Sequence, residues 1–472
     1  MDVAIIVVSL LLLMVLSYRG YSIIVLAPIF ALLAAATSEW SLMPLYSELF
    51  MTKMAEYIKM YFPVILLGAI FGKVMEEGGL ATVIADAIVA KMGKKNAIMA
   101  VVLAAAALTY GGVSGFVIVF AVYSFAKALF RKADIPKRLM PAAIFMGTFS
   151  FATGSMPGSP QIQNIVPTVF YGTTTWAGPV NGLLGSAIIF VLGMAWFAFR
   201  RRQALKSGEG YGDHADQVKG EQDPRYLPPL YLAVLPLVAV VVLNFYLSNP
   251  FDWQWGYFWK SELLDSLKPL QISLLATDVQ RVKTLWSLNA ALVVGIVLAI
   301  GIGFERIRYN GSLTKPINEG TTGSIQAILN TAAGFGYGSV VAKLAGFKVI
   351  KDIMMSITLG PGPLFSEAVA VNVMAGVAGS GASGITIALG MLAQDYLEWA
   401  QTAHVPVEIV HRIACMSAGG LDTLPHNGGA ITFLMVCGLT HKEAYLDFVA
   451  LTLIKTVVPF ICIVIYAYTG WV

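Results

Sequence analysis

Two polar, glycine-rich stretches interrupt apolar runs in this sequence, and their side chains are of the kinds that bind a small anion. The first is residues 153–164 (TGSMPGSPQIQN), and the second is residues 417–429 (SAGGLDTLPHNGG). Hydroxyls, amides and the positive ends of helix dipoles can hold a carboxylate without a permanent cation, which keeps binding weak enough for release. The chemistry that these stretches favour is therefore reversible binding of a small anion.

Each polar stretch is interpreted as a break in a membrane helix. Hydrocarbon offers no partner to free backbone groups, so non-helical backbone is tolerated there only where protein or an aqueous cavity covers it. In the second break, Pro425 fits the first position of the resuming helix, with Asp422 or Thr423 as its cap. In the first break, Ser159 is the expected cap and Pro160 the first helical residue.

The two breaks and two hairpin tips are expected to converge on one binding site. The candidate substrate-binding residues are Ser114, Gly115, Ser155, Ser159, Gln161, Asn164, Ser383, Gly384, Thr423, His426 and Asn427. Polar groups inside membrane segments are usually functional, which favours the cluster as a whole. Any single serine can instead cap its own helix or bond back to it, and the glycines allow close backbone approach.

Three titratable residues are candidates for binding a coupling proton or cation: Asp422, His426 and Glu367. A histidine titrates near neutral pH, which suits proton coupling or a hydrogen bond to substrate, although a lone histidine is often structural. Asp422 could carry the proton, bind a cation or only cap its helix. Glu367 could instead pair with Lys343 or face the polar base of its hairpin.

The composition is that of a polytopic membrane protein. The 472 residues are 57% hydrophobic and 12% charged, with a mean hydropathy of +0.74. The small net charge of +4 gives no hint of nucleic acid. All three cysteines lie in apolar segments and suggest neither a disulfide framework nor a metal site, and no cofactor is expected.

Similar segments recur at a nearly constant separation, which favours an internal repeat. Ser114-Gly115 matches Ser383-Gly384 at a separation of 269 positions, Pro160 matches Pro425 at 265, and Gly68 and Gly72 match Gly334 and Gly338 at 266. One such match between apolar, glycine-rich segments can arise by chance, but three matches in the same order at nearly the same separation favour a repeat. Duplicated hairpins and broken helices are typical of secondary transporters, whose site lies at the repeat interface.

The distribution of lysine and arginine gives the two halves opposite orientations in the membrane. The predicted fold is an all-α polytopic membrane protein with inverted repeats, about ten spans, two re-entrant hairpins and two broken helices. Its expected parts are N-terminal spans (1–57), a first repeat (58–199, hairpin tip 111–115, broken helix 139–170), a cytoplasmic linker (200–228), connecting spans with an aromatic external loop (229–318) and a second repeat (319–472, hairpin tip 379–384, broken helix 409–438).

Residues 421–445 (LDTLPHNGGAITFLMVCGLTHKEAY) and 154–164 (GSMPGSPQIQN) resemble the gluconate permease (GntP) family of bacterial carboxylate symporters. The resemblance is closest to its D-3-hydroxybutyrate permease branch. It implies import of a short hydroxy acid or sugar acid, such as 3-hydroxybutyrate, coupled to protons or sodium, in the inner (cytoplasmic) membrane of a bacterium. Membership of the wider ion-transporter superfamily would imply a homodimer with an elevator-like movement.

Two other function classes fit parts of the sequence. Residues 112–115 and 381–384 both read G-x-S-G, and His426 could act as a base in an intramembrane serine hydrolase. The duplication argues against an enzyme, because catalysis needs one nucleophile and the first half has no histidine to match His426. A cation/proton antiporter of the same superfamily would need more buried acids than Asp422 and Glu367.

Overall fold

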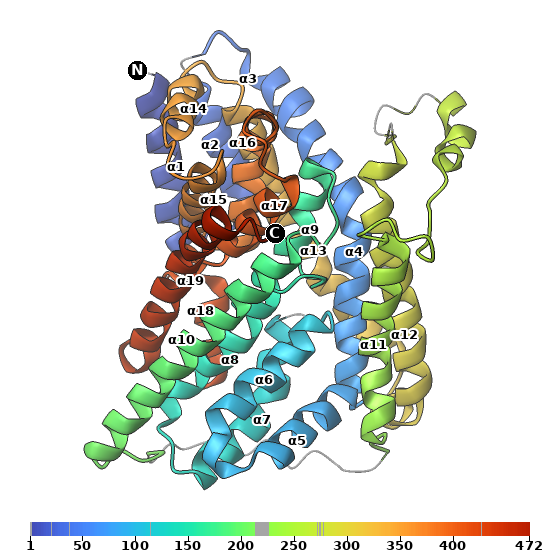
Figure 1. Cartoon of the computed structure of the whole chain (residues 1–472), viewed down its shortest axis with the longest axis vertical. Helices are drawn as coiled ribbons and strands as arrows, with labels where there is room; N and C mark the ends of the chain where they lie inside the picture. The colour runs from blue at the N-terminus through green and yellow to red at the C-terminus, as the bar shows by residue number, and fades with distance from the viewer. Residues whose placement is uncertain are drawn as a thin grey trace.

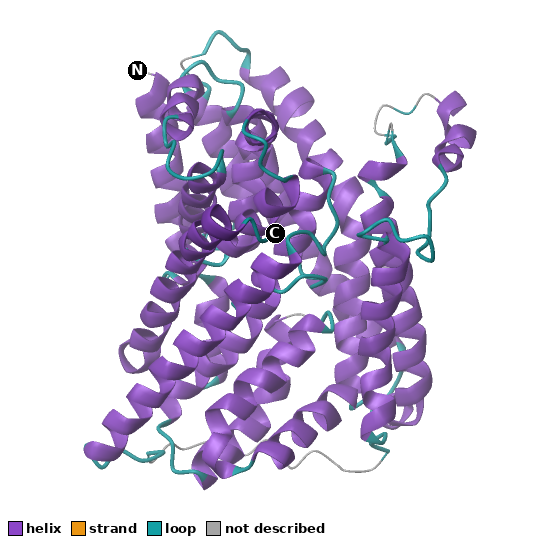
Figure 2. Cartoon of the chain, viewed as in Figure 1, coloured by secondary structure: helices purple, strands orange, loops and turns teal. Residues whose placement is uncertain are grey.

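The computed structural model describes residues 2–472 except 20, 37, 114, 213–225, 271, 273–274, 277 and 426. Two candidate site residues, Ser114 and His426, therefore lie outside the described residues. The described part of the chain is helical and contains no strand (Figure 2). The predicted all-α class is confirmed.

The first half of the chain forms one series of helices, in which η marks short 3₁₀- or π-helical pieces. The elements are α1 (Asp2–Tyr18), α2 (Ile23–Ala34), α3 (Leu42–Pro44), η1 (Leu45–Phe50), α4 (Met51–Glu77), α5 (Leu80–Met92), η2 (Lys94–Asn96), α6 (Ala97–Tyr110), α7 (Gly115–Lys132), η3 (Lys137–Leu139), α8 (Met140–Thr148), η4 (Phe151–Ser155), α9 (Ile162–Tyr171) and α10 (Pro179–Lys206).

The second half forms a similar series. Its elements are α11 (Leu230–Ser248), η5 (Ser261–Leu270), η6 (Val279–Arg281), α12 (Lys283–Tyr309), α13 (Thr314–Val341), α14 (Phe347–Met355), α15 (Leu364–Ala378), α16 (Gly381–Thr402), α17 (Val407–Ala418), η7 (Leu421–Thr423), α18 (Gly428–Val436) and α19 (His441–Thr469). The order of a long helix, a short helix, a hairpin, a broken helix and a long helix thus occurs as α4–α10 and again as α13–α19.

The two hairpins enter the molecule from opposite ends of its long axis. Helices α6 and α7 occupy its lower part and α15 and α16 its upper part (Figure 1). The 14 residues of α6 rise only about 21 Å at ~1.5 Å per residue, short of a hydrocarbon core of about 30 Å. Helix α4 packs along α13 and α12, and α12 packs along α11, which makes a bundle beside the hairpins (Figure 1).

Five of the described helical segments are long and apolar enough to cross a membrane, judged by length and composition. They are Leu42–Glu77, Pro179–Lys206, Leu230–Ser248, Lys283–Tyr309 and His441–Thr469, and four shorter apolar helices lie at Val3–Ser17, Ile23–Ala34, Ala97–Tyr110 and Leu364–Ala378. Helix α13 has 28 residues, but its many glycines and polar side chains keep it out of this apolar set.

The tip of the second hairpin is tighter than the sequence predicts. Gly379 ends α15 in the left-handed conformation (φ 60°), and Ser380 caps α16 by accepting a hydrogen bond from the Ser383 backbone N–H at 3.4 Å. Helix α16 therefore begins at Gly381, and Ser383 and Gly384 lie in its first turn instead of in a loop. A Cβ on Gly384 would come within 2.2 Å of the Ala375 Cα, so this glycine lets the two legs pack closely.

A buried ion-pair cluster joins α10 to α19, the last long helix of each series. Asp447 of α19 is fully buried and accepts hydrogen bonds from Arg200 Nε at 2.8 Å and Trp196 Nε1 at 2.9 Å, both on α10. Arg138 lies 3.7 Å from Asp447 and pairs with Glu209 just beyond α10, at 2.6 Å. The hydrogen bond from Arg138 lowers the pKa of the Glu209 carboxyl. This cluster holds the two long helices together at one end of the molecule.

The contact between α4 and α13 depends on a glycine, and substitution tests it. A Cβ on Gly320 of α13 would meet the backbone of Ile70 at 2.8 Å, whereas a Cβ on Gly323 would meet nothing within 4 Å. We expect Gly320→Ala to lower the free energy of unfolding by about 1–3 kcal/mol. Gly323→Ala is the matched control and should be neutral or stabilising by up to about 1 kcal/mol, because alanine favours helix. Thermal unfolding of both variants in detergent, followed by tryptophan fluorescence, measures the difference; equal melting temperatures would contradict the packing.

Candidate functional site

The first helix break is held open by side chains that satisfy its backbone. Helix α8 ends at Thr148, η4 follows, and α9 begins at Ile162 with Gln161 at the N-cap position. The prediction that Ser159 caps this helix and Pro160 begins it is wrong. The Ser159 hydroxyl donates instead to the Ala152 carbonyl at 2.7 Å, a group that the irregular turn leaves without a helical partner.

Two amide side chains fasten this break to its surroundings. Gln161 Nε2 donates to the Thr109 carbonyl at 2.8 Å, near the tip of the first hairpin. Asn164 Nδ2 donates to the carbonyls of Ser159 and Thr175, both at 2.8 Å. The sequence predicts that both amides bind substrate, but their donors are used to satisfy backbone carbonyls.

The second break is capped later than the sequence predicts. Helix α17 ends at Ala418, and α18 begins at Gly428. Its cap is Asn427, whose Oδ1 accepts from the Ala430 N–H at 2.8 Å while its Nδ2 donates to the Gly379 carbonyl at 2.8 Å. Asn427 therefore ties the second break to the tip of the second hairpin, and the assignment of the cap to Asp422 or Thr423, with Pro425 beginning the helix, is wrong.

The side chains of Asp422 and Thr423 point to α19 instead of capping a helix. Thr423 Oγ1 lies 2.6 Å from Thr452 Oγ1. Asp422 Oδ1 accepts a hydrogen bond from Lys455 Nζ at 2.6 Å, and both side chains are at most 5% exposed. Lys455 also donates to the Phe149 carbonyl at 3.3 Å and lies over the Phe145 ring. One lysine thus contacts both breaks.

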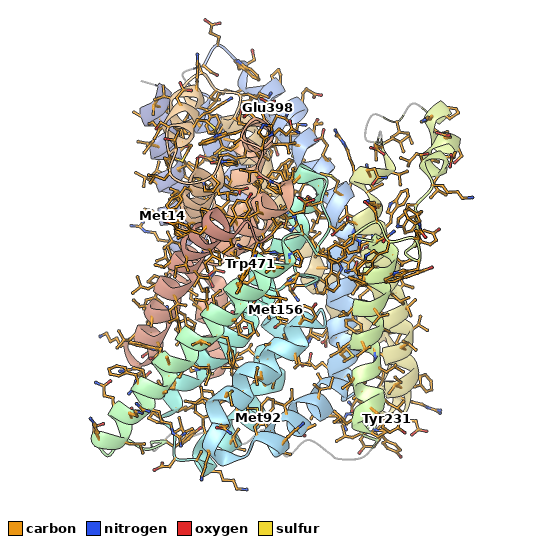
Figure 3. All side chains as sticks on the ribbon, in the orientation of Figure 1. Met14, Met92, Met156, Tyr231, Glu398 and Trp471 are labelled. Carbon is orange, nitrogen blue, oxygen red and sulfur yellow. The ribbon has the colours of Figure 1, made fainter. Side chains whose placement is uncertain are left out.

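A narrow cavity, called the central cavity below, lies between the two breaks. Its lining consists of Phe149, Ser150, Thr153, Gly154, Ser155, Gln163, Ile189, Cys415, Met416, Gly419, Asp422 and Lys455. The breaks approach so closely that a Cβ on Gly154 would come within 2.5 Å of the Cys415 carbonyl. Met156, at the end of η4, lies near the middle of the long axis, with Glu398 near one end and Met92 toward the other (Figure 3).

The cavity contains few of the predicted site residues. Ser155 and Asp422 line it, whereas Ser159, Gln161, Asn164, Thr423, Asn427, Glu367, Ser383, Gly384 and Gly115 are outside its lining. A Cβ on Gly115 would meet the Phe149 ring at 2.4 Å, so this glycine allows α7 to pack against the first break. The sequence predicts a carboxylate site without a permanent cation, whereas the lining of this cavity includes the lysine Lys455.

A second polar cluster lies behind the first break, around the fully buried Arg412 of α17. Its guanidinium donates to Asn164 Oδ1 and the Ala177 carbonyl at 2.9 Å, and to the carbonyls of Gly154 and Thr175 at 3.2 Å. Its neighbour His411 bonds to Thr173 Oγ1 and Asn164 Oδ1. Buried carbonyls that lose a donor are costly, so we interpret Arg412 as a clamp on the broken backbone.

Glu367, the candidate coupling acid on the second hairpin, has Tyr171 as its partner. Glu367 is fully buried and accepts a short hydrogen bond from the Tyr171 hydroxyl of α9, and its second oxygen has no partner among the described residues. The alternative that Glu367 pairs with Lys343 is therefore wrong. Glu367 links the second hairpin to the first broken helix. His426, the base of the hydrolase alternative, lies outside the described residues.

Lys455 and Arg412, two cations that contact the helix breaks, are not among the residues that the sequence predicts for the site. Lys455 stands in TLIKTVV and Arg412 in VHRIACM, both apolar surroundings. Charged residues within membrane segments usually face a cavity or a partner. An isolated lysine or arginine inside an apolar run is the signal that could have found them, in addition to the basic residues that mark loop orientation.

The clamp role of Arg412 predicts that lysine will not replace it. A lysine has no planar fork and cannot donate along the diverging directions that reach Asn164, Ala177 and Thr175. We expect Arg412→Lys to lower the free energy of unfolding by about 1–3 kcal/mol for each carbonyl left unpaired. Thermal unfolding in detergent measures the loss, with Arg201→Lys, near one end of α10, as the control. Wild-type stability of Arg412→Lys would contradict the clamp.

Comparison with known proteins places this geometry among transporters. No protein-family model matches the sequence. The chain is 43% identical over 484 residues to the uncharacterized transporter YxjC of Bacillus subtilis (strain 168), with 100% of both chains covered. It is also 30% identical over 181 residues to an uncharacterized transporter of Haemophilus influenzae, covering 38% of this chain and 40% of the relative.

The fold also has a counterpart among solved structures. The crystal structure of the Alcanivorax borkumensis YdaH transporter, which has an unusual topology, superposes with a TM-score of 0.59 at 12% identity, covering 90% of this chain and 89% of that one. At this identity the likeness concerns the fold alone. The full-length similarity to YxjC is the stronger result, and by it the chain belongs to the family of multi-pass membrane transporters that includes YxjC of Bacillus subtilis.

Proposed function

We propose that the chain is a symporter that imports a short hydroxy-carboxylate, such as 3-hydroxybutyrate, with a proton or sodium ion. The observation that carries the proposal is the Lys455 ammonium in the lining of the central cavity, between two helix breaks. An ammonium in a water-poor cavity attracts a carboxylate more strongly than one in water does. The resemblance of residues 154–164 and 421–445 to the gluconate permease family supports the same substrate class.

The other polar groups of the cavity suit a small hydroxy acid. Ser155 and Gln163 line it together with Lys455. Ser150 and Thr153 also line it, but their hydroxyls already donate to the carbonyls of Met146 and Thr148 and can only accept from a substrate hydroxyl. Hydroxyl and amide groups can donate to a carboxylate and also exchange hydrogen bonds with a substrate hydroxyl. In this conformation the cavity is closed down to about the size of one water molecule, so binding of a hydroxy acid requires the two breaks to move apart. Ser155 and Asp422 remain in the proposed site, and Lys455 replaces the amides that the sequence favoured.

The remaining parts of the proposal rest on family resemblance and on the repeated succession of elements. In an inverted-repeat transporter, the substrate site lies where the two repeats meet and alternates between the two sides of the membrane. We propose that the site alternates by an elevator-like movement and that the protein is a homodimer. We place it in the inner membrane of a bacterium. The coupling candidates are Asp422, Glu367 and His426, of which Asp422 lines the cavity.

Uptake by reconstituted protein tests this function. Radiolabelled 3-hydroxybutyrate is offered to proteoliposomes under an imposed proton gradient or sodium gradient, with gluconate and lactate as competitors. We expect the label to accumulate under one of the gradients. Lys455→Met should reduce uptake at least tenfold, because a lost charge-assisted hydrogen bond of about 1.5–3 kcal/mol corresponds to at least that factor.

The control is Lys348→Met, which removes an exposed lysine on α14, remote from the cavity lining. It should transport like the wild-type protein. Wild-type protein that accumulates none of these acids under either gradient would refute the proposed function. Full activity of Lys455→Met would remove the site from the central cavity.

A further inference from the structure

The ion pair of Lys455 and Asp422 leaves the central cavity without net charge before any substrate enters. The two groups are 2.6 Å apart, and the lysine and aspartate side chains are 1% and 5% exposed. An anion that joined this pair unaccompanied would add one uncompensated negative charge to a buried site, which is strongly unfavourable. A substrate carboxylate therefore needs either a cation to accompany it or the loss of a negative charge from the site.

We infer that the substrate carboxylate replaces Asp422 as the partner of Lys455, while Asp422 takes up the coupling proton; this rests on the proposed function. One proton from the external solution binds an Asp422 carboxylate oxygen, and one carboxylate anion binds Lys455 Nζ. The net charge of the site is zero before and after. Release to the cytoplasm reverses both steps, and Asp422 then returns its proton there and pairs again with Lys455.

A helix end beside Asp422 favours its ionised form, and an acceptor left unpartnered in the described part of the chain lies by the same turn of backbone. Its Oδ2 would lie 3.1 Å from a Cβ on Gly381, the first residue of α16, where the positive end of a helix dipole favours the ionised form. The Asn372 side chain of α15 reaches Gly420, two residues before Asp422. Its Nδ2 donates to the Ala368 carbonyl, and its buried Oδ1 has no partner among the described residues. That oxygen is an acceptor of the kind a protonated carboxyl requires.

Several titratable groups on the elements that pack against η7 have partners of their own. The elements packed against η7 include α15, α16 and α19. The three acids Glu367, Asp395 and Asp447 contact Tyr171, Lys351 and Arg200, respectively. The Tyr445 hydroxyl donates to the Thr423 carbonyl, and His441 contacts the Pro425 carbonyl. Cys415 of α17 also lines the cavity. Among the described residues, Lys455 is the charged group in contact with Asp422, so a proton on Asp422 changes the charge that the substrate meets.

The exchange predicts electroneutral symport with one proton for each anion. Purified wild-type protein in weakly buffered detergent should take up about one proton per bound 3-hydroxybutyrate, as measured with a pH-indicator dye. In proteoliposomes a pH gradient of one unit should give about tenfold accumulation, and a potassium diffusion potential set with valinomycin should leave the uptake rate unchanged.

The variant Asp422→Asn separates binding from coupling. It should still bind 3-hydroxybutyrate but take up no proton. It should retain exchange of labelled for unlabelled substrate, because exchange needs only the protein with substrate bound to cross between the two sides. It should lose net uptake, because the empty site of the variant carries the uncompensated charge of Lys455 and cannot return. The control Asp352→Asn, an exposed position on α14, should behave like the wild-type protein.

The outcomes distinguish this inference from the proposed function. Uptake driven by sodium alone, uptake driven by membrane potential, or unchanged proton uptake in Asp422→Asn would overturn the exchange and leave the carboxylate transporter standing. The two wild-type measurements apply even if the variant does not fold. Wild-type protein that neither binds nor transports 3-hydroxybutyrate, gluconate or lactate would overturn both.

Discussion

Unsatisfied backbone at two helix breaks is the constraint on which the rest of this structure depends. In a bilayer, carbonyl and N–H groups released from a helix must find partners within the protein. Much of the buried polarity of this chain serves that need. Arg412 donates to four carbonyls across the first break, and Asn427 caps the second break while holding a hairpin tip.

This use of polar groups narrows the search for ligand-binding residues. An amide whose donors already bond to backbone carbonyls has less capacity for a substrate, which applies to Gln161 and Asn164. Lys455 differs, because it lines the cavity and its hydrogen bonds to Asp422 and Phe149 use two of its three N–H groups. A transporter must bind weakly enough to release its cargo, and competition between Asp422 and the substrate for one lysine would limit affinity in that way.

The fold class and the positions of both breaks could be predicted from the sequence, because clusters of proline, glycine and polar residues inside apolar runs are typical of interrupted membrane helices. The predicted helix starts are two to three residues too early: the first residues of α9 and α18 are Ile162 and Gly428, not Pro160 and Pro425. A proline can begin a helix, but it also fits an extended turn, and local sequence does not distinguish the two. The partner of Asp422 lies 33 positions away on another helix, and no local pattern indicates such a contact.

Binding of the substrate carboxylate to Lys455 in the central cavity is the claim on which the proposed transport depends. The most direct measurement is a cryo-electron microscopy structure of the protein in lipid nanodiscs with saturating 3-hydroxybutyrate. We predict density for the acid between the two breaks, with its carboxylate within hydrogen-bonding distance of Lys455 Nζ and the lysine separated from Asp422. Ligand density elsewhere, with the pair of Lys455 and Asp422 intact, would contradict the claim.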